Sequence, residues 1–307
     1  MKNIIIFPGQ GYFDVELLNK KYVEEFCYKY EIDDIFELVR KDKNNIHITK
    51  YAQVLIVAVE VAQFLEYCKK NNCEDDILIG YSLGEVSSLI SAGVLDIKEG
   101  INFVRARGEN SEIFYKEKLY SKKYTVGKVP FEENIEEELR KEGFEIINYV
   151  PDFTKTNTSA IIIGKEKDKI FEFMKAKRKN ELLENLHISE LSCPFHTNLM
   201  VELQKEQIRI FDQNITKFDA KMLTKIFCTR TATLYKEISK QEINKSLAEY
   251  LISPINTKKT MEYLEKSEYK NRDILVTMGR LFIADHLKEQ CDIIGLNGNI
   301  NDISNLI

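Results

Sequence analysis

Ser82 lies between two glycines in the stretch GYSLG, directly after the apolar run DILIG. This spacing fits G-x-S-x-G, in which a sharp strand-to-helix turn exposes a serine hydroxyl that can attack a carbonyl carbon. The N–H groups at the start of the following helix lie where an oxyanion would form. A serine that only caps a buried helix fits the same five residues, so the motif by itself leaves both interpretations open.

A serine nucleophile needs a base, and the chain has four histidines: His47, His187, His196 and His286. His196 stands in the stretch SCPFHTNLM, where a proline fixes the chain and Phe195 supplies an apolar wall. A lone histidine is usually a structural residue, so the residue type alone does not identify the base.

Composition excludes several other classes. The chain has 307 residues, 44% of them hydrophobic, and a formal net charge of −5, which argues against a general nucleic-acid binder. We see no run of the ~20 apolar residues that a membrane span needs, and the N-terminal apolar run is too short for a signal peptide. The cysteines form no C-x-x-C pair and have no histidine at metal-ligand spacing. They therefore predict reduced thiols in a cytosolic protein, without a metal site.

Alternating strands and helices must position these residues. NIIIF and DILIG are apolar runs of strand length, and each is followed by a helical pattern. A long helix over 51–71, apolar nearly all round in its first half, predicts a buried element. This alternation predicts an α/β fold with a mostly parallel sheet.

The pattern changes over residues 122–192. The order of strands and helices there is β-α-β-β-α-β, which is the ferredoxin-like signature. We therefore expect a small inserted subdomain over 122–192, and a large α/β subdomain built from residues 1–121 and 193–307.

Five motifs in this order resemble the acyltransferase family, whose best-known members are the malonyl-CoA:acyl-carrier-protein transacylases. The motifs are FPGQG, GYSLGE, RARG, CPFH and YLISPINTKKTMEYL, and they extend along essentially the whole chain. The resemblance implies a large α/β-hydrolase-like subdomain with a parallel sheet, and the ferredoxin-like insert between the arginine and histidine motifs.

The resemblance also assigns catalytic roles. It implies that Ser82 is the nucleophile and His196 the general base. In the family a backbone carbonyl orients the histidine, and that carbonyl would belong to Asn256 here. The oxyanion hole would be formed by the backbone N–H groups of Gln10 and Leu83.

Arg107, in RARG, matches the arginine that binds the free carboxylate of the malonyl group. Arg105 is its rival on the same predicted helix. Residues two positions apart on a helix point to roughly opposite sides, so only one of the two should face the site.

Four further positions concern specificity. Phe195 resembles the malonyl-selective pattern, in which an aromatic ring would crowd a branch at the α-carbon. Tyr81 stands where the family usually has histidine, Tyr12 where it usually has serine, and Ser111 where it usually has methionine. These departures concern the shape of the acyl pocket more than the type of reaction.

The implied activity is a ping-pong transfer of a malonyl group from CoA to the phosphopantetheine thiol of an acyl carrier protein, in fatty acid or polyketide biosynthesis. No bound cofactor or metal is implied, and we expect a cytoplasmic monomer with no nucleic-acid or membrane partner. Related alternatives are a proofreading hydrolase of acyl-CoA or acyl carrier protein thioesters, and the malonyl-loading subunit of malonate decarboxylase. A non-catalytic docking module is a further alternative, and it would be marked by loss of Ser82 or His196.

Overall fold

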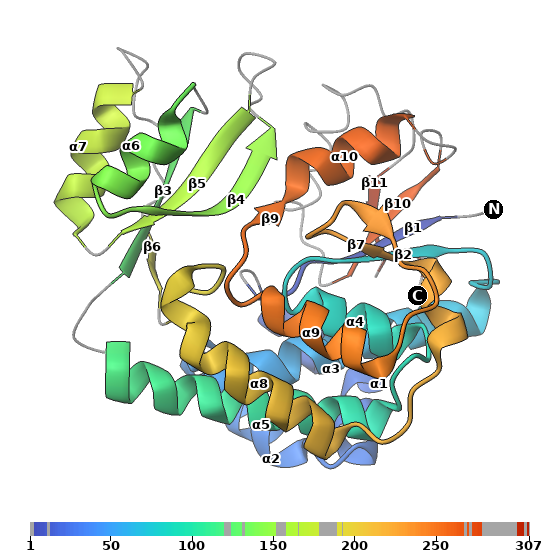
Figure 1. The fold of residues 1–307 in the computed structure, drawn as a ribbon. Helices are drawn as coiled ribbons and strands as arrows, with labels where there is room; N and C mark the ends of the chain where they lie inside the picture. The colour runs from blue at the N-terminus through green and yellow to red at the C-terminus, as the bar shows by residue number, and fades with distance from the viewer. Residues whose placement is uncertain are drawn as a thin grey trace.

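The structure is a computed structural model that describes residues 3–10, 13–119, 124–130, 133–151, 158–164, 166–177, 189–191, 193–266, 269, 272–277, 300–303 and 306. It contains two sheets, which Figure 1 shows side by side. The predicted α/β class with a mostly parallel sheet is confirmed.

The larger sheet has the strand order β11-β10-β1-β2-β7-β8, and all its pairs are parallel except β7 with β8. Its strands are β1 (Ile4–Phe7), β2 (Ile77–Gly80), β7 (Ile226–Cys228), β8 (Thr233–Leu234), β10 (Ile274–Val276) and β11 (Ile300–Asp302). The two central strands, β1 and β2, are buried along their whole length, which explains why they are continuous apolar runs rather than alternating ones.

Helices cover both faces of this sheet. Ile5 and Phe7 of β1 point into the core formed with the helices, and Ile4 and Ile6 point into a second core that includes residues of α10. In Figure 1, α10 lies on one side of the sheet, and the other helices of this part gather on the opposite side. The helices opposite α10 are α1 (Lys21–Lys29), α2 (Asp33–Lys41), α3 (Thr49–Lys70), α4 (Gly84–Ser91), α5 (Ile97–Phe114), α8 (Val201–Asn214) and α9 (Lys240–Glu249), and α10 itself extends over Thr257–Lys266.

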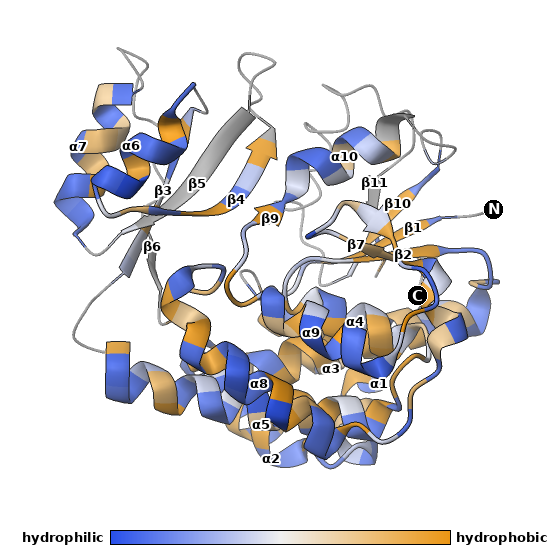
Figure 2. Ribbon diagram, viewed as in Figure 1, coloured by the Kyte–Doolittle hydropathy of each residue, from blue (hydrophilic) through white to orange (hydrophobic). Residues whose placement is uncertain are grey.

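Helix α3 is the central helix of this core. Its apolar residues continue around most of its circumference, and it packs between α5, α4 and α1. In Figure 2 much of the α3 ribbon has the hydrophobic colour, beside the more polar α5 and α8. By length and composition α3 could cross a membrane, but 78% of its apolar window is buried inside the protein. Its hydrophobicity is therefore accounted for by the protein core.

The smaller sheet has the order β6-β3-β5-β4-β9. Its elements are β3 (Tyr124–Pro130), α6 (Ile135–Lys141), β4 (Glu145–Pro151), β5 (Thr158–Gly164), α7 (Lys167–Lys177), β6 (Ser189–Leu191) and β9 (Ile255–Asn256). The chain order β-α-β-β-α-β matches the predicted pattern up to β6. The predicted boundaries at 121–122 and at 192 lie outside the described residues, so the exact division remains a prediction.

Strand β9 was not expected from the sequence. Ile255 and Asn256 pair in parallel with Asn148 and Tyr149 of β4, although they follow the insert by some sixty residues. The smaller sheet is therefore completed by a strand from the C-terminal part of the chain. This strand directly precedes α10, which packs on the larger sheet.

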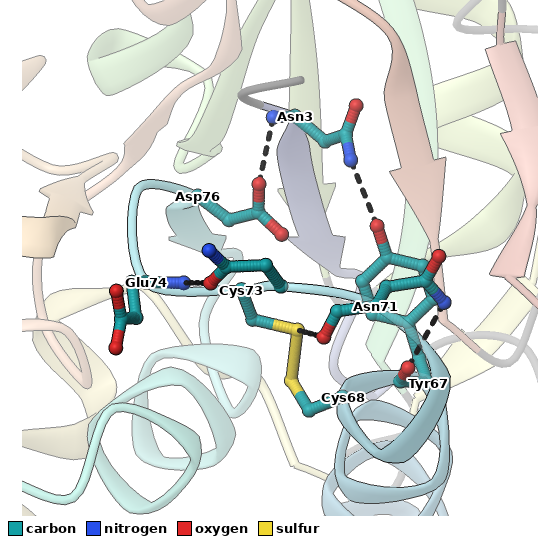
Figure 3. The surroundings of a disulfide bond; sticks show 8 residues. Asn3, Tyr67, Cys68, Asn71, Cys73, Glu74 and Asp76 are labelled. Carbon is teal, nitrogen blue, oxygen red and sulfur yellow. Dashed lines mark hydrogen bonds between the residues drawn. A yellow bond between two sulfur atoms is a disulfide. The ribbon is translucent and has the colours of Figure 1, made fainter.

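Cys68 and Cys73 form a disulfide, with 5.7 Å between their Cα atoms (Figure 3). The prediction of six reduced thiols is therefore wrong for this pair. Cys68 lies in the last turn of α3, and the chain turns back beyond Asn71, whose side chain bonds the carbonyl of Tyr67. The helix end brings together two cysteines whose spacing is not a C-x-x-C motif. Among the other cysteines, Cys27, Cys193 and Cys228 are buried free thiols, and Cys291 lies outside the described residues.

Candidate active site

Ser82 lies in the turn between β2 and α4, and its backbone has a φ of 54°. A non-glycine residue in this left-handed region is held there at a cost of about 1–3 kcal/mol, which the surrounding structure must supply. Gly84 lets α4 approach β1, because a Cβ atom at this position would lie 2.0 Å from the carbonyl oxygen of Phe7. The turn thus has the strained, tightly packed form that G-x-S-x-G predicts.

His196 is the histidine that the fold brings to this turn. Its Nε2 lies 2.8 Å from Ser82 Oγ, although the two residues are 114 positions apart. Its Nδ1 lies 3.2 Å from the carbonyl oxygen of Ser253. Because a carbonyl only accepts, Nδ1 carries the proton, and Nε2 is left as the acceptor for the serine hydroxyl.

Burial lowers the pKa of His196 to about 4. The residue is 9% exposed, and its backbone N–H donates to the carbonyl of Leu251 at 2.7 Å. The imidazole is therefore neutral at pH 7, the form in which it can take a proton from Ser82.

The prediction that Asn256 orients His196 is wrong, because the carbonyl that faces the ring belongs to Ser253. The Asn256 carbonyl instead accepts from the Thr260 hydroxyl at 3.0 Å, and its side chain accepts from the N–H of Lys259 at 3.0 Å. Asn256 thus caps the first turn of α10, which begins at Thr257. Which carbonyl of a loop turns toward the ring depends on backbone torsions, which the residue types do not specify.

Arg107 lies on α5 and is 8% exposed. Its Nε donates to Gln207 Oε1 at 2.9 Å, and its Nη1 donates to Gln53 Oε1 at 2.7 Å. Within the described part of the chain it has no ion pair with a carboxylate. Burial lowers its pKa to about 10, so it stays charged at pH 7. A buried cation held by two neutral amides is suited to an anion that arrives from outside.

Arg105 faces elsewhere, as the helical spacing predicts. Its two Nη atoms bind the carboxylate of Asp34 at 3.0 and 3.1 Å, and Nη2 also donates to the carbonyl of Glu31. The two arginines therefore have different surroundings, and the role of Arg107 in binding the carboxylate stays a prediction. Gln53 and Gln207 were not predicted, because nothing in their local sequence marks them as partners of Arg107.

The turn after β1 lies against the serine turn. Gly9 has a φ of 72°, and a Cβ atom there would lie 2.3 Å from the carbonyl oxygen of Tyr81 and 3.2 Å from the nitrogen of Leu83. Gln10 directly follows this contact. Among the described residues, no hydrogen-bond acceptor is found for the N–H of Leu83. The two proposed oxyanion donors therefore belong to segments in direct contact.

The specificity positions have different surroundings. Phe195 is half-buried, and its ring centre lies 5.7 Å from the Arg107 guanidinium. Ser111 is buried one turn after Arg107 and donates to that residue's carbonyl at 2.8 Å. Tyr81 packs on the core between the sheet and α10. Tyr12 lies outside the described residues.

Of the remaining histidines, His47 is exposed in a short helical turn (Lys43–His47), and His187 and His286 lie outside the described residues. The searched part of the chain contains no group of three or more side chains that could hold a metal ion.

No protein-family model matches the chain. The malonyl CoA-acyl carrier protein transacylase of Bacillus subtilis is 30% identical over 117 residues, which is 35% of this chain and 37% of that protein. The transacylase of the same name from Buchnera aphidicola is 23% identical over 93% of this chain and 94% of its own length. The matches to the first three curated relatives cover only 30–38% of those proteins.

Solved structures match over the whole chain. An acyl carrier protein S-malonyltransferase from Vibrio cholerae aligns with a TM-score of 0.78 at 19% identity, covering 100% of this chain and 99% of that one. A malonyl-transacylase solved in complex with a type II polyketide acyl carrier protein aligns with a TM-score of 0.75 at 18% identity, covering 100% and 98%. The chain therefore has the fold of the malonyl-CoA:acyl-carrier-protein transacylases, and proteins with similar sequences carry that name.

Proposed function

We propose that this protein transfers a malonyl group from CoA to the phosphopantetheine thiol of an acyl carrier protein, through an ester on Ser82. The observation that carries the proposal is the 2.8 Å contact between Ser82 Oγ and a neutral, buried His196. The names of the relatives and of the structural neighbours support the same reaction.

In the first half-reaction, His196 Nε2 takes the proton of Ser82 as Oγ attacks the thioester carbon of malonyl-CoA. The tetrahedral oxyanion accepts hydrogen bonds from the N–H groups of Gln10 and Leu83, each worth roughly 3 kcal/mol of barrier. When the carbon–sulfur bond breaks, His196 returns the proton to the departing sulfur. CoA leaves as a thiol, and the malonyl ester of Ser82 remains.

In the second half-reaction, His196 takes the proton of the phosphopantetheine thiol, and the sulfur attacks the ester carbon. The carbon–oxygen bond to Ser82 breaks, and Oγ regains a proton from His196. The product is malonyl-acyl carrier protein, and the enzyme is returned to its starting state. These steps use only groups of this chain and the two thiols.

Arg107 gives the proposal its substrate class. A malonyl thioester brings one carboxylate into a site from which water must be kept, and a buried carboxylate needs a fixed cation opposite it. The planar guanidinium can donate to both carboxylate oxygens. Gln53 and Gln207 already hold its Nε and Nη1, so the group is oriented before the substrate arrives.

A hydrolase would release the same ester to water, and the comparisons do not favour it. A docking module without activity is disfavoured because Ser82 and His196 are both present and in contact. The carrier protein that accepts the malonyl group determines whether the product serves fatty acid synthesis, polyketide synthesis or malonate decarboxylase. We further propose a cytoplasmic monomer, although disulfides such as Cys68–Cys73 are uncommon in reducing compartments.

Intact-protein mass spectrometry tests the reaction. The protein is mixed separately with malonyl-CoA, methylmalonyl-CoA and acetyl-CoA, and the acyl adduct is followed before and after addition of a holo acyl carrier protein. We expect a malonyl adduct that persists in water and moves to the carrier. Ser82→Ala should fold normally and give none. An adduct on Ser82→Ala would overturn the nucleophile, and rapid loss to water without transfer would favour the hydrolase.

A further inference from the structure

Glu60 is a carboxylic acid in the most buried part of α3. Its side chain has no exposed surface, and its neighbours along the helix, Val59 and Val61, are equally buried. Burying a carboxyl group is costly unless its oxygens are hydrogen-bonded. The contacts of Glu60 therefore indicate what this group does in the fold.

The two oxygens of Glu60 bind two different segments of the site. Oε1 accepts a hydrogen bond from the backbone N–H of Gly9 at 2.9 Å. Oε2 accepts a short hydrogen bond from the hydroxyl of Ser87. One carboxyl group thus bridges the turn after β1 and the helix that follows Ser82.

These are the two segments that carry the proposed oxyanion donors. Gly9 directly precedes Gln10, and Ser87 lies in α4, four residues after Leu83. The contact between Gly9 and the serine turn shows that the segments touch, but Gly9 itself has no side chain that could lock the contact. Glu60, from the central helix α3, forms hydrogen bonds to both segments and so fixes one relative to the other.

We propose that Glu60 is a positioning residue of the oxyanion hole, which fixes the turn at Gly9 relative to α4 so that the N–H groups of Gln10 and Leu83 converge on one point. This inference rests on the proposed roles of those two N–H groups. An error of about 1 Å in such a donor's position can cost a hundredfold in rate, so a rigid anchor has a direct effect on catalysis.

The bridge depends on hydrogen bonding and not on charge. Burial raises the pKa of Glu60 to about 7, and within the described part of the chain its carboxyl group bonds Gly9 and Ser87. A carboxylate accepts from both partners, and a protonated carboxyl can accept from Gly9 and donate to Ser87. A glutamine would do the same with its Oε1 and its amide N–H. Alanine would leave both partners without a bond.

The test compares Glu60→Gln, Glu60→Ala and Val57→Ala. Val57 is a fully buried residue one turn earlier on α3, so Val57→Ala is a matched control for loss of packing in that helix. Two acyl donors are used: malonyl-CoA, and p-nitrophenyl acetate, which needs the oxyanion hole but has no carboxylate for Arg107. The amount of folded, active enzyme is measured for each variant, and kcat and KM are determined separately.

We expect Glu60→Ala to lower kcat with both donors by roughly tenfold to a hundredfold, the range for a misplaced oxyanion donor, with KM for malonyl-CoA nearly unchanged. Glu60→Gln should stay within about threefold of the unmodified protein, because it restores both hydrogen bonds. Val57→Ala should lower thermal stability and leave kcat per folded enzyme unchanged.

Three results would overturn the inference: an unchanged kcat in Glu60→Ala, a Glu60→Gln variant as slow as Glu60→Ala, or an equal loss of kcat in Val57→Ala. Failure of the proposed function has a different signature. The unmodified protein would then form no malonyl adduct, while the reaction with p-nitrophenyl acetate would still depend on residue 60. Inertness of the unmodified protein toward both donors would overturn both proposals.

Discussion

Replacement of Arg107 by alanine should change the donor preference of the enzyme and not only its rate. The malonyl carboxylate would then enter a buried site without a cation. Removing one partner of a buried charge pair costs about 2–5 kcal/mol, much of it the cost of the charge left unpaired. At about 1.4 kcal/mol per factor of ten, malonyl loading should fall between roughly thirtyfold and several thousandfold.

Acetyl-CoA has no carboxylate, so its loading should change much less in Arg107→Ala. Truncation also leaves Gln53 Oε1 and Gln207 Oε1 without their donor, which costs about 1–3 kcal/mol each if both stay buried. That loss lowers the stability of the protein, and it affects the reactions with malonyl-CoA and acetyl-CoA equally. The ratio of malonyl to acetyl adduct on Ser82 therefore separates substrate recognition from general damage.

Arg105→Ala is the matched control. It removes an arginine two positions away whose ion pair with Asp34 is solvent-accessible and worth at most about 1 kcal/mol. Its malonyl-to-acetyl ratio should equal that of the unmodified protein. The ratio is measured by intact-protein mass spectrometry at short reaction times. A ratio that stays the same in Arg107→Ala would refute the assignment of the carboxylate site and with it the malonyl substrate class.

Further changes have expected outcomes of their own. Because burial holds the pKa of His196 near 4, acylation of Ser82 should lose no rate to histidine protonation between pH 7 and about pH 5, and a rate that halves near pH 6.5 would contradict this. Methylmalonyl-CoA should load about 10–200-fold more slowly than malonyl-CoA if Phe195 crowds the α-carbon, and equal rates would remove that role. Burial raises the pKa of Glu60 from 4.5 to about 7, so the unfolded chain loses this proton first and the free energy of unfolding falls as the pH rises through that range. In Glu60→Gln the fall between pH 5 and pH 8 should be roughly 2–3 kcal/mol smaller than in the unmodified protein, as measured by urea unfolding at both pH values, and an equal fall in the two proteins would argue against this. Reducing the Cys68–Cys73 disulfide, which closes a loop between residues five apart, should lower the free energy of unfolding by roughly 2 kcal/mol, while Cys68→Ser should be insensitive to reductant.

The sequence by itself determined the elements whose physical requirements are local. The run DILIG followed by a glycine-flanked serine predicts a strand, a tight turn and a helix, and Ser82 lies in such a turn. Helical spacing separated Arg107 from Arg105, because residues two apart on a helix must point apart. The mostly apolar sequence of α3 predicts a buried helix.

Tertiary structure decided every contact between segments that are far apart in the chain. The carbonyl that holds His196 is that of Ser253 and not of Asn256, since its direction follows from the path of a loop. The bonds from Arg107 to Gln53 and Gln207 join three helices, and β9 joins the smaller sheet from a later part of the chain. Glu60 could be recognised in the sequence as a charge in an apolar helix, but its partners Gly9 and Ser87 are 51 and 27 positions away. Residue types limit what a side chain can bond, and only the packing of the chain determines which groups come within a hydrogen bond of it.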